Sequence, residues 1–110
     1  MTYAEYAGAL LELAARAPSP EWRVIMNFYA AVHATNSVLY AEGTAPLTHQ
    51  RHEANILGHP SLSNWLDEYI ELKDLSLDAR YRPQQHPLAE HDIAIAERLT
   101  HALLTACGLG

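Results

Sequence analysis

The sequence lacks several features that would point directly to a class of protein. It has a single cysteine, Cys107, so no disulfide can form within the chain, which suits a reducing compartment. It has only 7 Lys and Arg against 13 Asp and Glu, a formal net charge of −6. That balance argues against extended DNA binding, which needs many cations against the phosphate backbone.

Signals for export and for membrane insertion are also missing. The N-terminal segment carries Glu5 and Glu12 and has no basic first stretch, unlike a secretory signal peptide. The longest uncharged stretch, residues 24–41, contains Asn27 and His33, which are too polar for lipid. We therefore expect a cytoplasmic protein with no membrane association.

The motifs of common catalytic chemistry are absent as well. The sequence has no Gly-x-Ser-x-Gly nucleophile motif, no glycine-rich phosphate loop and no His-Glu-x-x-His zinc motif. Seven histidines invite a metal hypothesis, and His49 and His52 could share one helix face. His91 and His101, however, would point roughly 80° apart on one helix. We expect neither a metal nor another cofactor.

What the sequence does contain is helical periodicity along its length, without the alternating pattern of strands. Its 110 residues suit one domain, residues 1–110. Capping residues and Pro or Gly breaks predict helices over about residues 3–16, 20–42, 49–57, 61–80 and 88–107. We predict an all-α, up-and-down bundle of four longer helices and one short one.

The second of these helices is the predicted centre of the bundle. A helix without a charged face packs inside other helices, and residues 24–41 carry no formal charge. One stripe of this helix is mainly apolar and should face the core: Ile25, Phe28, Val32, Thr35 and Leu39. A second stripe beside it is polar and aromatic: Tyr29, His33, Asn36 and Tyr40. Such groups are costly to bury unless they form hydrogen bonds or take part in the function.

Each of the polar features has a structural and a functional interpretation. The second stripe either lines a binding site or consists of core polar groups that fix the register of the helices. Arg80, Tyr81 and Arg82 either cap the fourth helix or clamp an anion such as phosphate. On the first helix, periodicity places these side chains inward: Tyr6, Leu10, Leu13 and Ala17.

Three segments taken together resemble the HEPN superfamily of small prokaryotic helical domains. They are the run FYAAVHATNSVLYAEG at residues 28–43, the Thr-His pair that ends at His49 with Arg51 after it, and the amphipathic helix that ends in DARYRP. The similarity spans about residues 22–83. The resemblance maps the family's aromatic-to-His run onto Phe28–His33, its loop His onto His49, and its terminal Arg-Tyr onto Arg80 and Tyr81.

The resemblance implies a bundle of four or five helices that is often dimeric and occurs in toxin–antitoxin and defence systems. It also implies a minimal nucleotidyltransferase as a possible partner. Active members of the superfamily are metal-independent RNases in which an Arg stabilises the phosphoryl oxygens and a His a few residues later acts as acid or base. Arg80 and His86 have a spacing of this kind.

Our leading hypothesis is a HEPN-like homodimeric domain that binds a nucleotide, RNA or a partner protein beside the central helix. Binding would then involve Tyr29, Asn36, Tyr40, Tyr81 and Arg82. If the chain cuts RNA, the acids, bases and phosphate-binding groups would come from His33, His49, Arg51, Arg80 and His86. The rival hypothesis is a protein-interaction module without catalysis, so the sequence leaves open whether the chain is an enzyme.

Overall fold

The structure is a computed structural model that describes residues 1–82, 84, 85 and 87–109, and no strand occurs among them. One turn of 3-10 helix, η1 (Ser63–Trp65), precedes the fourth α-helix. The α-helices are α1 (Tyr3–Arg16), α2 (Pro20–Leu39), α3 (His49–Gly58), α4 (Leu66–Tyr81) and α5 (Glu90–Ala106). The prediction of an all-α fold is confirmed.

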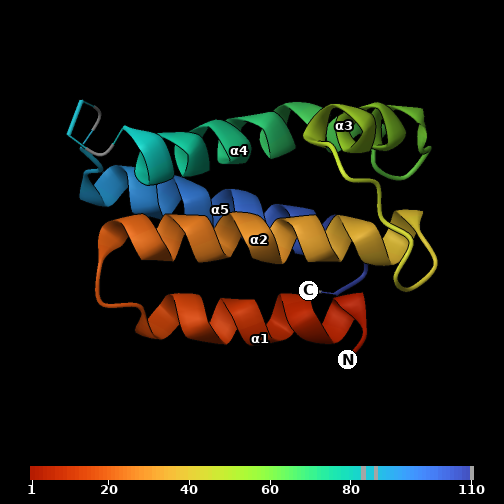
Figure 1. Ribbon diagram of the computed structural model, residues 1–110, viewed down its shortest axis with the longest axis horizontal. Coiled ribbons are helices and arrows are strands. Elements are labelled where there is room, and N and C mark those ends of the chain that lie inside the picture. The colour runs from red at the N-terminus through yellow and green to blue at the C-terminus, as the bar shows by residue number, and fades with distance from the viewer. Residues whose placement is uncertain (83, 86, 110) are drawn as a thin grey trace.

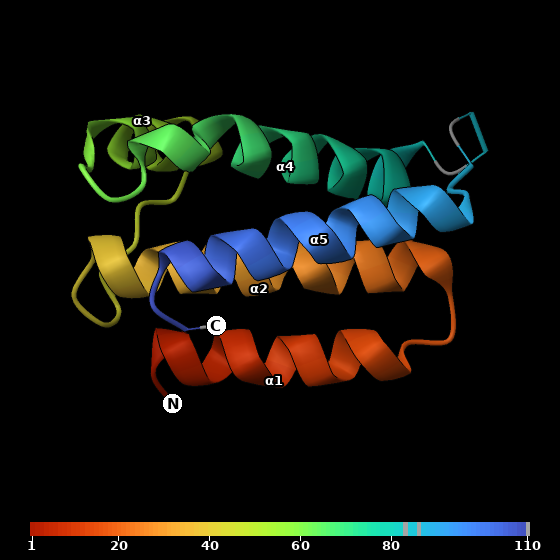
Figure 2. The same cartoon turned by 180° about the vertical axis from the view of Figure 1, so that it is seen from behind.

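The helices form three layers. α2 and α5 lie side by side in the middle, α1 covers one side of this pair, and α3 and α4 cover the other (Figure 1). The view from behind shows the same order, with α5 now in front of α2 (Figure 2). The four longer helices alternate in direction along the chain, and α2 contacts each of the other α-helices. The central position predicted for the second helix is therefore correct.

The start of α2 follows the sequence signals, whereas its end comes earlier than predicted. The Ser19 hydroxyl accepts a hydrogen bond from the Trp22 N–H, and Pro20 occupies the first turn, where its missing N–H costs nothing. α2 stops at Leu39 rather than near residue 42, because Tyr40 takes an extended conformation. From there the Tyr40 hydroxyl reaches α3, so a tertiary contact accompanies the early end.

The apolar stripe of α2 lies in the main core, as predicted. Ile25, Phe28 and Thr35 are buried, and Val32 and Leu39 pack against the same cluster. The Phe28 ring packs at 5.6 Å from the ring of Tyr69 on α4. Although α2 is the most continuously uncharged helix, none of the helices in the described part of the chain has the length and apolarity needed to cross a bilayer.

The predicted inward face of α1 is wrong. Tyr6 and Leu13 are 46% and 52% exposed, whereas the buried residues of α1 are Ala7 and Ala14. α1 meets α2 through small side chains, among them Ala34. Small side chains on both helices allow a close approach, which turns the larger residues of α1 to its flank. Periodicity in the sequence shows which residues share a stripe, but it does not show which stripe is buried.

Candidate functional site

The polar stripe of α2 divides into two halves with different surroundings. Asn36 is buried, and Tyr40, at the end of the stripe, lies against α3. Tyr29 and His33 are only half-buried and lie on the flank of α2 between α1 and α4. The stripe therefore does not line one cleft: its second half, with Asn36 buried and Tyr40 half-buried, lies against α3, and its first half contributes to the surface of the flank.

His52 on α3 is the centre of the buried half. The residue is 4% exposed, and both ring nitrogens have partners: Nε2 lies 2.7 Å from the Thr35 hydroxyl, and Nδ1 lies 2.7 Å from the Tyr40 hydroxyl. Tyr40 also accepts a hydrogen bond of 3.1 Å from the Asn55 carboxamide. This network joins α2 to α3 and fixes the orientation of the imidazole.

The hydrogen bonds of the network are consistent with a neutral imidazole protonated on Nε2. The Thr35 hydroxyl lies within 3.0 Å of two carbonyl oxygens of its own helix, so it can donate to one of them and accept from His52 Nε2. Nδ1 is then free to accept from the Tyr40 hydroxyl. Burial, reinforced by the positive charge that His49 can carry, lowers the pKa of His52 to about 4, although Glu53 opposes this shift. His52 is therefore a structural group and a poor acid or base at neutral pH.

A small cavity lies beside this network. It has a volume of about 90 Å³ and is lined by Val32, Asn36, His49, His52 and the loop at residues 45–48. Sites that enclose a drug-sized ligand usually measure ~300 Å³ or more. The cavity is therefore too small to enclose a nucleotide base.

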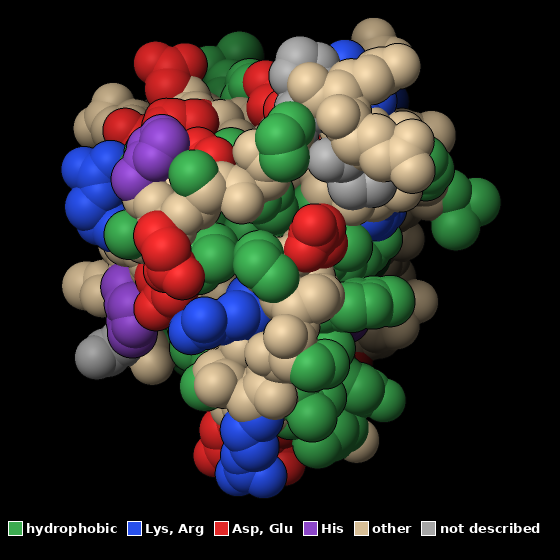
Figure 3. Space-filling model, turned by 90° about the vertical axis from the view of Figure 1, so that its left-hand side faces the viewer, with side chains coloured by type: hydrophobic (Ala, Val, Ile, Leu, Met, Phe, Trp, Pro, Cys, Tyr) green, Lys and Arg blue, Asp and Glu red, His purple; other side chains and the backbone are tan. Residues whose placement is uncertain are grey.

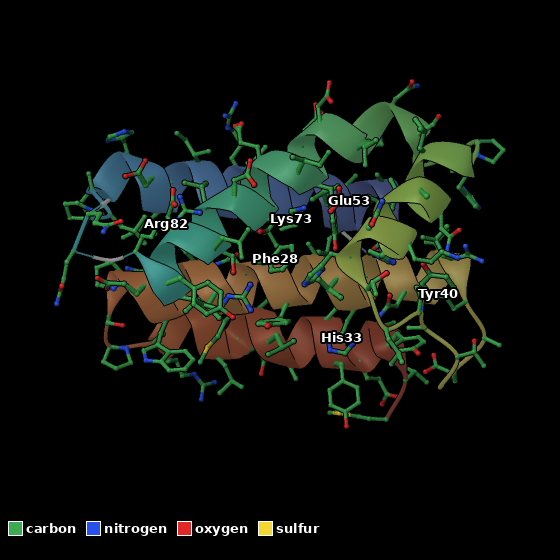
Figure 4. The ribbon with its side chains drawn as sticks, turned by 45° about the horizontal axis from the view of Figure 1, so that its top comes forward. Phe28, His33, Tyr40, Glu53, Lys73 and Arg82 are labelled. Carbon is green, nitrogen blue, oxygen red and sulfur yellow. The ribbon has the colours of Figure 1, made fainter. Side chains whose placement is uncertain are left out.

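His33 faces α1 and lies away from the network. Its ring stacks on Tyr6 at 5.2 Å and lies 5.9 Å from the ring of Tyr3, and Figure 4 shows it on the α1 side of α2. Its Nδ1 is buried without a hydrogen-bond partner among the described residues. Burial lowers the pKa of His33, and the nearby Glu42 partly offsets this effect.

Arg80 lies on the α4 side of the same α2 flank. Its Nη1 donates a 2.7 Å hydrogen bond to the Tyr29 hydroxyl, and its guanidinium lies 5.7 Å from the centre of the Tyr29 ring and 5.1 Å from that of Tyr81. Arg82 instead lies 3.7 Å from its helix neighbour Asp78. Of the two predicted arginines, Arg80 is therefore held between aromatic rings, and Arg82 is at the exposed end of the helix.

The remaining candidates lie apart from these residues. His49, at the start of α3, packs 5.8 Å from the Phe28 ring, and Arg51 is exposed on the outer side of α3. Within the described part of the chain, no hydrogen bond, ion pair or ring contact joins any two of the proposed catalytic residues His33, His49, Arg51 and Arg80. His86 lies outside the described residues.

Other charged groups near α3 and α5 form ion pairs. Lys73 of α4 pairs with Glu53 of α3, and Figure 4 shows the two side chains together between these helices. Arg23 of α2 lies 3.7 Å from Glu97 of α5, beside a groove of about 330 Å³ between α1 and α5. Among the described residues, no three His, Cys, Asp or Glu side chains are grouped so that they could hold a metal ion.

One uncharged surface feature is a face shared by α1 and α2, which we call the hairpin face. Its side chains are uncharged, and each is at least partly exposed; Trp22 is 54% exposed. Figure 3 looks onto the end where α1 joins α2 and shows hydrophobic side chains gathered along one edge. The residues of the hairpin face are Tyr6, Leu10 and Leu13 of α1 and Trp22, Met26, Tyr29 and His33 of α2.

Sequence reasoning identified Tyr29 and His33 but missed the rest of this face. The signal that could have identified it is that α1 carries an alanine edge as well as a large apolar stripe, so one of the two had to remain open. Comparison with known proteins adds no further guide: no family model matches the chain, and no curated protein or solved structure matches it.

Proposed function

We propose that this chain is a HEPN-like, non-catalytic interaction module that pairs with a second copy of itself through the hairpin face. The observation that carries the proposal is the uncharged line of partly exposed aromatic and aliphatic side chains from Tyr6 and His33 at one end to Trp22 at the other. On a protein with a net charge of −6, an uncharged apolar face of this size is often a functional surface.

Charges at the two ends of the face favour a second copy as the occupant. Glu5 and Glu42 are exposed near the Tyr6 end, and Arg16 is exposed at the opposite end of α1. A two-fold axis across the middle of the face would place Glu5 and Glu42 of one copy over Arg16 of the other. The same apolar side chains would meet in the centre of the contact.

The dimensions of the face predict a weak dimer. With a rise of ~1.5 Å per residue and two helices ~10 Å thick, the hairpin presents a flat area on the order of 400 Å². A standard stable interface buries about 800 Å² on each partner. The dimer should therefore dissociate on dilution.

Sedimentation velocity at increasing protein concentration tests this proposal. The wild-type chain should shift from monomer towards dimer, whereas Trp22→Glu should stay monomeric because it replaces a large apolar side chain of the contact with a charged one. The matched control is Leu57→Glu, which adds the same charge at a residue that is 60% exposed on α3. A wild-type chain that remains monomeric throughout, or a Trp22→Glu variant that dimerises equally well, would contradict the proposal.

Catalysis is the less favoured alternative. A metal-independent RNase would require an Arg and a His on one substrate, and the observed separation of His33, His49 and Arg51 gives no support for this. The test is incubation with total RNA in EDTA. RNA that stays intact agrees with the binding module, and cleavage that Arg80→Ala abolishes would establish the alternative.

A second binding function is favoured by the surroundings of Arg80. A guanidinium held against two tyrosine rings still has N–H groups that can bind a phosphate oxygen, and Tyr81, which is largely exposed, offers a ring on which a base can stack. Nucleotide or RNA binding at this site should be lost in Arg80→Gln and kept in Arg51→Gln, as measured by titration calorimetry with a nucleoside monophosphate. Equal binding by both variants would rule this site out.

The resemblance to the HEPN superfamily extends the proposal to the biological setting. It suggests a toxin–antitoxin or defence component, with a minimal nucleotidyltransferase as a possible second partner. A purified nucleotidyltransferase from the same source should then co-elute with the wild-type chain and lose binding with Trp22→Glu. Co-elution that is unchanged by this substitution would place any such partner on another surface.

A further inference from the structure

The main hydrophobic core is built without α1. Its buried members come from α2 onwards, and among the described residues α1 contributes none of them. α1 instead belongs to a small second cluster with Ala7, Ala34 and Leu104 as its buried residues. Because alanine side chains bury little apolar area, this cluster holds α1 with far less hydrophobic stabilisation than the main core gives the other helices.

The polar contacts that hold the N-terminal end of α1 are few and lie at the surface. The Tyr3 N–H donates to the Glu42 carboxylate at 3.1 Å, and the Tyr3 hydroxyl accepts from the N–H groups of Gly43 at 3.1 Å and Ala45 at 3.3 Å. Water can replace exposed hydrogen bonds of this kind at little cost. α1 is therefore held by close packing of small side chains, by the rings of Tyr3 and Tyr6 against His33, and by surface hydrogen bonds for which solvent competes.

The connection from α1 to α2 is a short segment at residues 17–19. Ala17 is extended, as expected for a residue before proline, and Pro18 has no N–H to donate. Ser19 uses its side chain to cap α2 rather than to hold α1. A change of backbone direction in this segment would leave both helices intact.

We propose that α1 is a separable helix and that the α2–α5 surface beneath it also accepts the α1 of a second copy. This surface fits α1, because α1 of the same chain already packs there through the edge formed by Ala7, Leu11 and Ala14. An α1 donated by another copy would make the same contacts, so the exchange changes only the path of residues 17–19.

This exchange is independent of the proposed function. Pairing through the hairpin face uses the flank of α1 that carries Tyr6 and Leu13, whereas exchange uses the alanine edge of the helix. Either can occur without the other. A monomeric wild-type result in sedimentation would contradict the hairpin-face dimer and would leave slow exchange of α1 to be measured by itself.

Disulfide trapping between two differently tagged chains tests the exchange directly. Both chains carry Cys107→Ser; one also carries Ala7→Cys and the other Ala34→Cys, two positions that belong to the same small cluster. When the two variants are mixed in a glutathione redox buffer, a disulfide should link one chain that carries Ala7→Cys to one chain that carries Ala34→Cys. The matched control replaces Ala7→Cys with Glu12→Cys, an exposed position on another side of α1, and should give several-fold less product.

Two results would overturn the proposal. The first is that no disulfide links the two different variants, although a single chain that carries both Ala7→Cys and Ala34→Cys forms its internal disulfide under the same conditions. The second comes from hydrogen–deuterium exchange of the unmodified protein. α1 amides should exchange faster than those of α4 and as one group, and equal protection of α1 and α4 would show that α1 is not separable.

Discussion

His52 shows how one buried side chain connects the sequence to the stability of the fold. It is neutral, and its two nitrogens join Thr35 of α2 to Tyr40 at the end of that helix. The aromatic ring of Tyr69 packs 5.4 Å from it, and burial raises the pKa of Tyr69, which keeps that phenol neutral as well. Protonation of His52 would place a charge among groups that cannot solvate it.

The low pKa of His52 predicts a loss of stability in mild acid. The unfolded chain takes up a proton near pH 6.5, whereas the folded chain resists protonation until about pH 4. Between these values the unfolded state binds more protons, so the free energy of unfolding falls as the pH falls. The shift corresponds to roughly 3 kcal/mol at the acid end, from ~1.4 kcal/mol per pKa unit.

Urea unfolding between pH 7.5 and pH 4 measures this dependence. His52→Gln should show a flatter profile over the same range, because its side chain does not titrate. His91→Gln, which removes a largely exposed imidazole, should keep the wild-type slope and serves as the control. An equal slope for the wild type and His52→Gln would contradict the assignment.

Thr35→Val is a nearly isosteric test of the same network. It removes the hydroxyl next to His52 Nε2 and leaves a buried N–H without a partner, which costs about 1–3 kcal/mol. Thr100→Val is the matched control: Thr100 is also buried, its short hydrogen bond of 2.7 Å goes to the Ala96 carbonyl of its own helix, and its contact with the Asn27 carbonyl of α2 is long, at 3.5 Å. Chemical denaturation should show a clearly larger loss for Thr35→Val, and equal losses would argue against the cross-helix bond.

Among the helices, α1 is the one that a single substitution should stabilise most clearly. Gly8 lies within α1, is exposed, and a Cβ added there would meet no atom within 4 Å. Gly8→Ala should therefore stabilise α1 by about 0.5–1 kcal/mol through helix propensity. Slower hydrogen exchange of α1 amides is the measurement.

Gly43→Ala gives the contrasting outcome. Gly43 has a φ of +79°, a backbone conformation that strains a residue with a Cβ, so this substitution should destabilise the turn after α2. The same Gly→Ala substitution is thus expected to raise stability at Gly8 and to lower it at Gly43. Stabilisation in both variants would contradict the backbone assignment at Gly43.

The starts of the first three helices could be predicted from the sequence because local chemistry determines them, whereas α4 begins at Leu66, later than the predicted start near residue 61 and without a side-chain cap. Thr2, Ser19 and Thr48 cap α1, α2 and α3, and each accepts the backbone hydrogen bond expected of its position. The end of α2 was not predicted because it coincides with the contact of Tyr40 with His52, a residue 12 positions away. Local patterns contain no information about such a partner.

The orientation of helices about their own axes was harder to predict than their extent. On α2, the stripe that contains Phe28 faces the main core, as predicted. On α1, a large apolar stripe containing Leu13 competes with an alanine edge containing Ala14, and the edge that allows closer packing is the buried one. The candidate site was therefore only partly predicted: Tyr29 and His33 were identified, but their partners on α1 were not.

For the whole molecule, we propose that two copies meet through the hairpin face. Hydroxyl-radical footprinting at low and high protein concentration tests it most directly, because the face contains reactive side chains: Tyr6, Trp22, Met26, Tyr29 and His33. We expect their oxidation to fall at high concentration, while that of His91, which is exposed on α5, stays constant. Unchanged oxidation of the hairpin face under conditions in which the chain is dimeric would contradict the account.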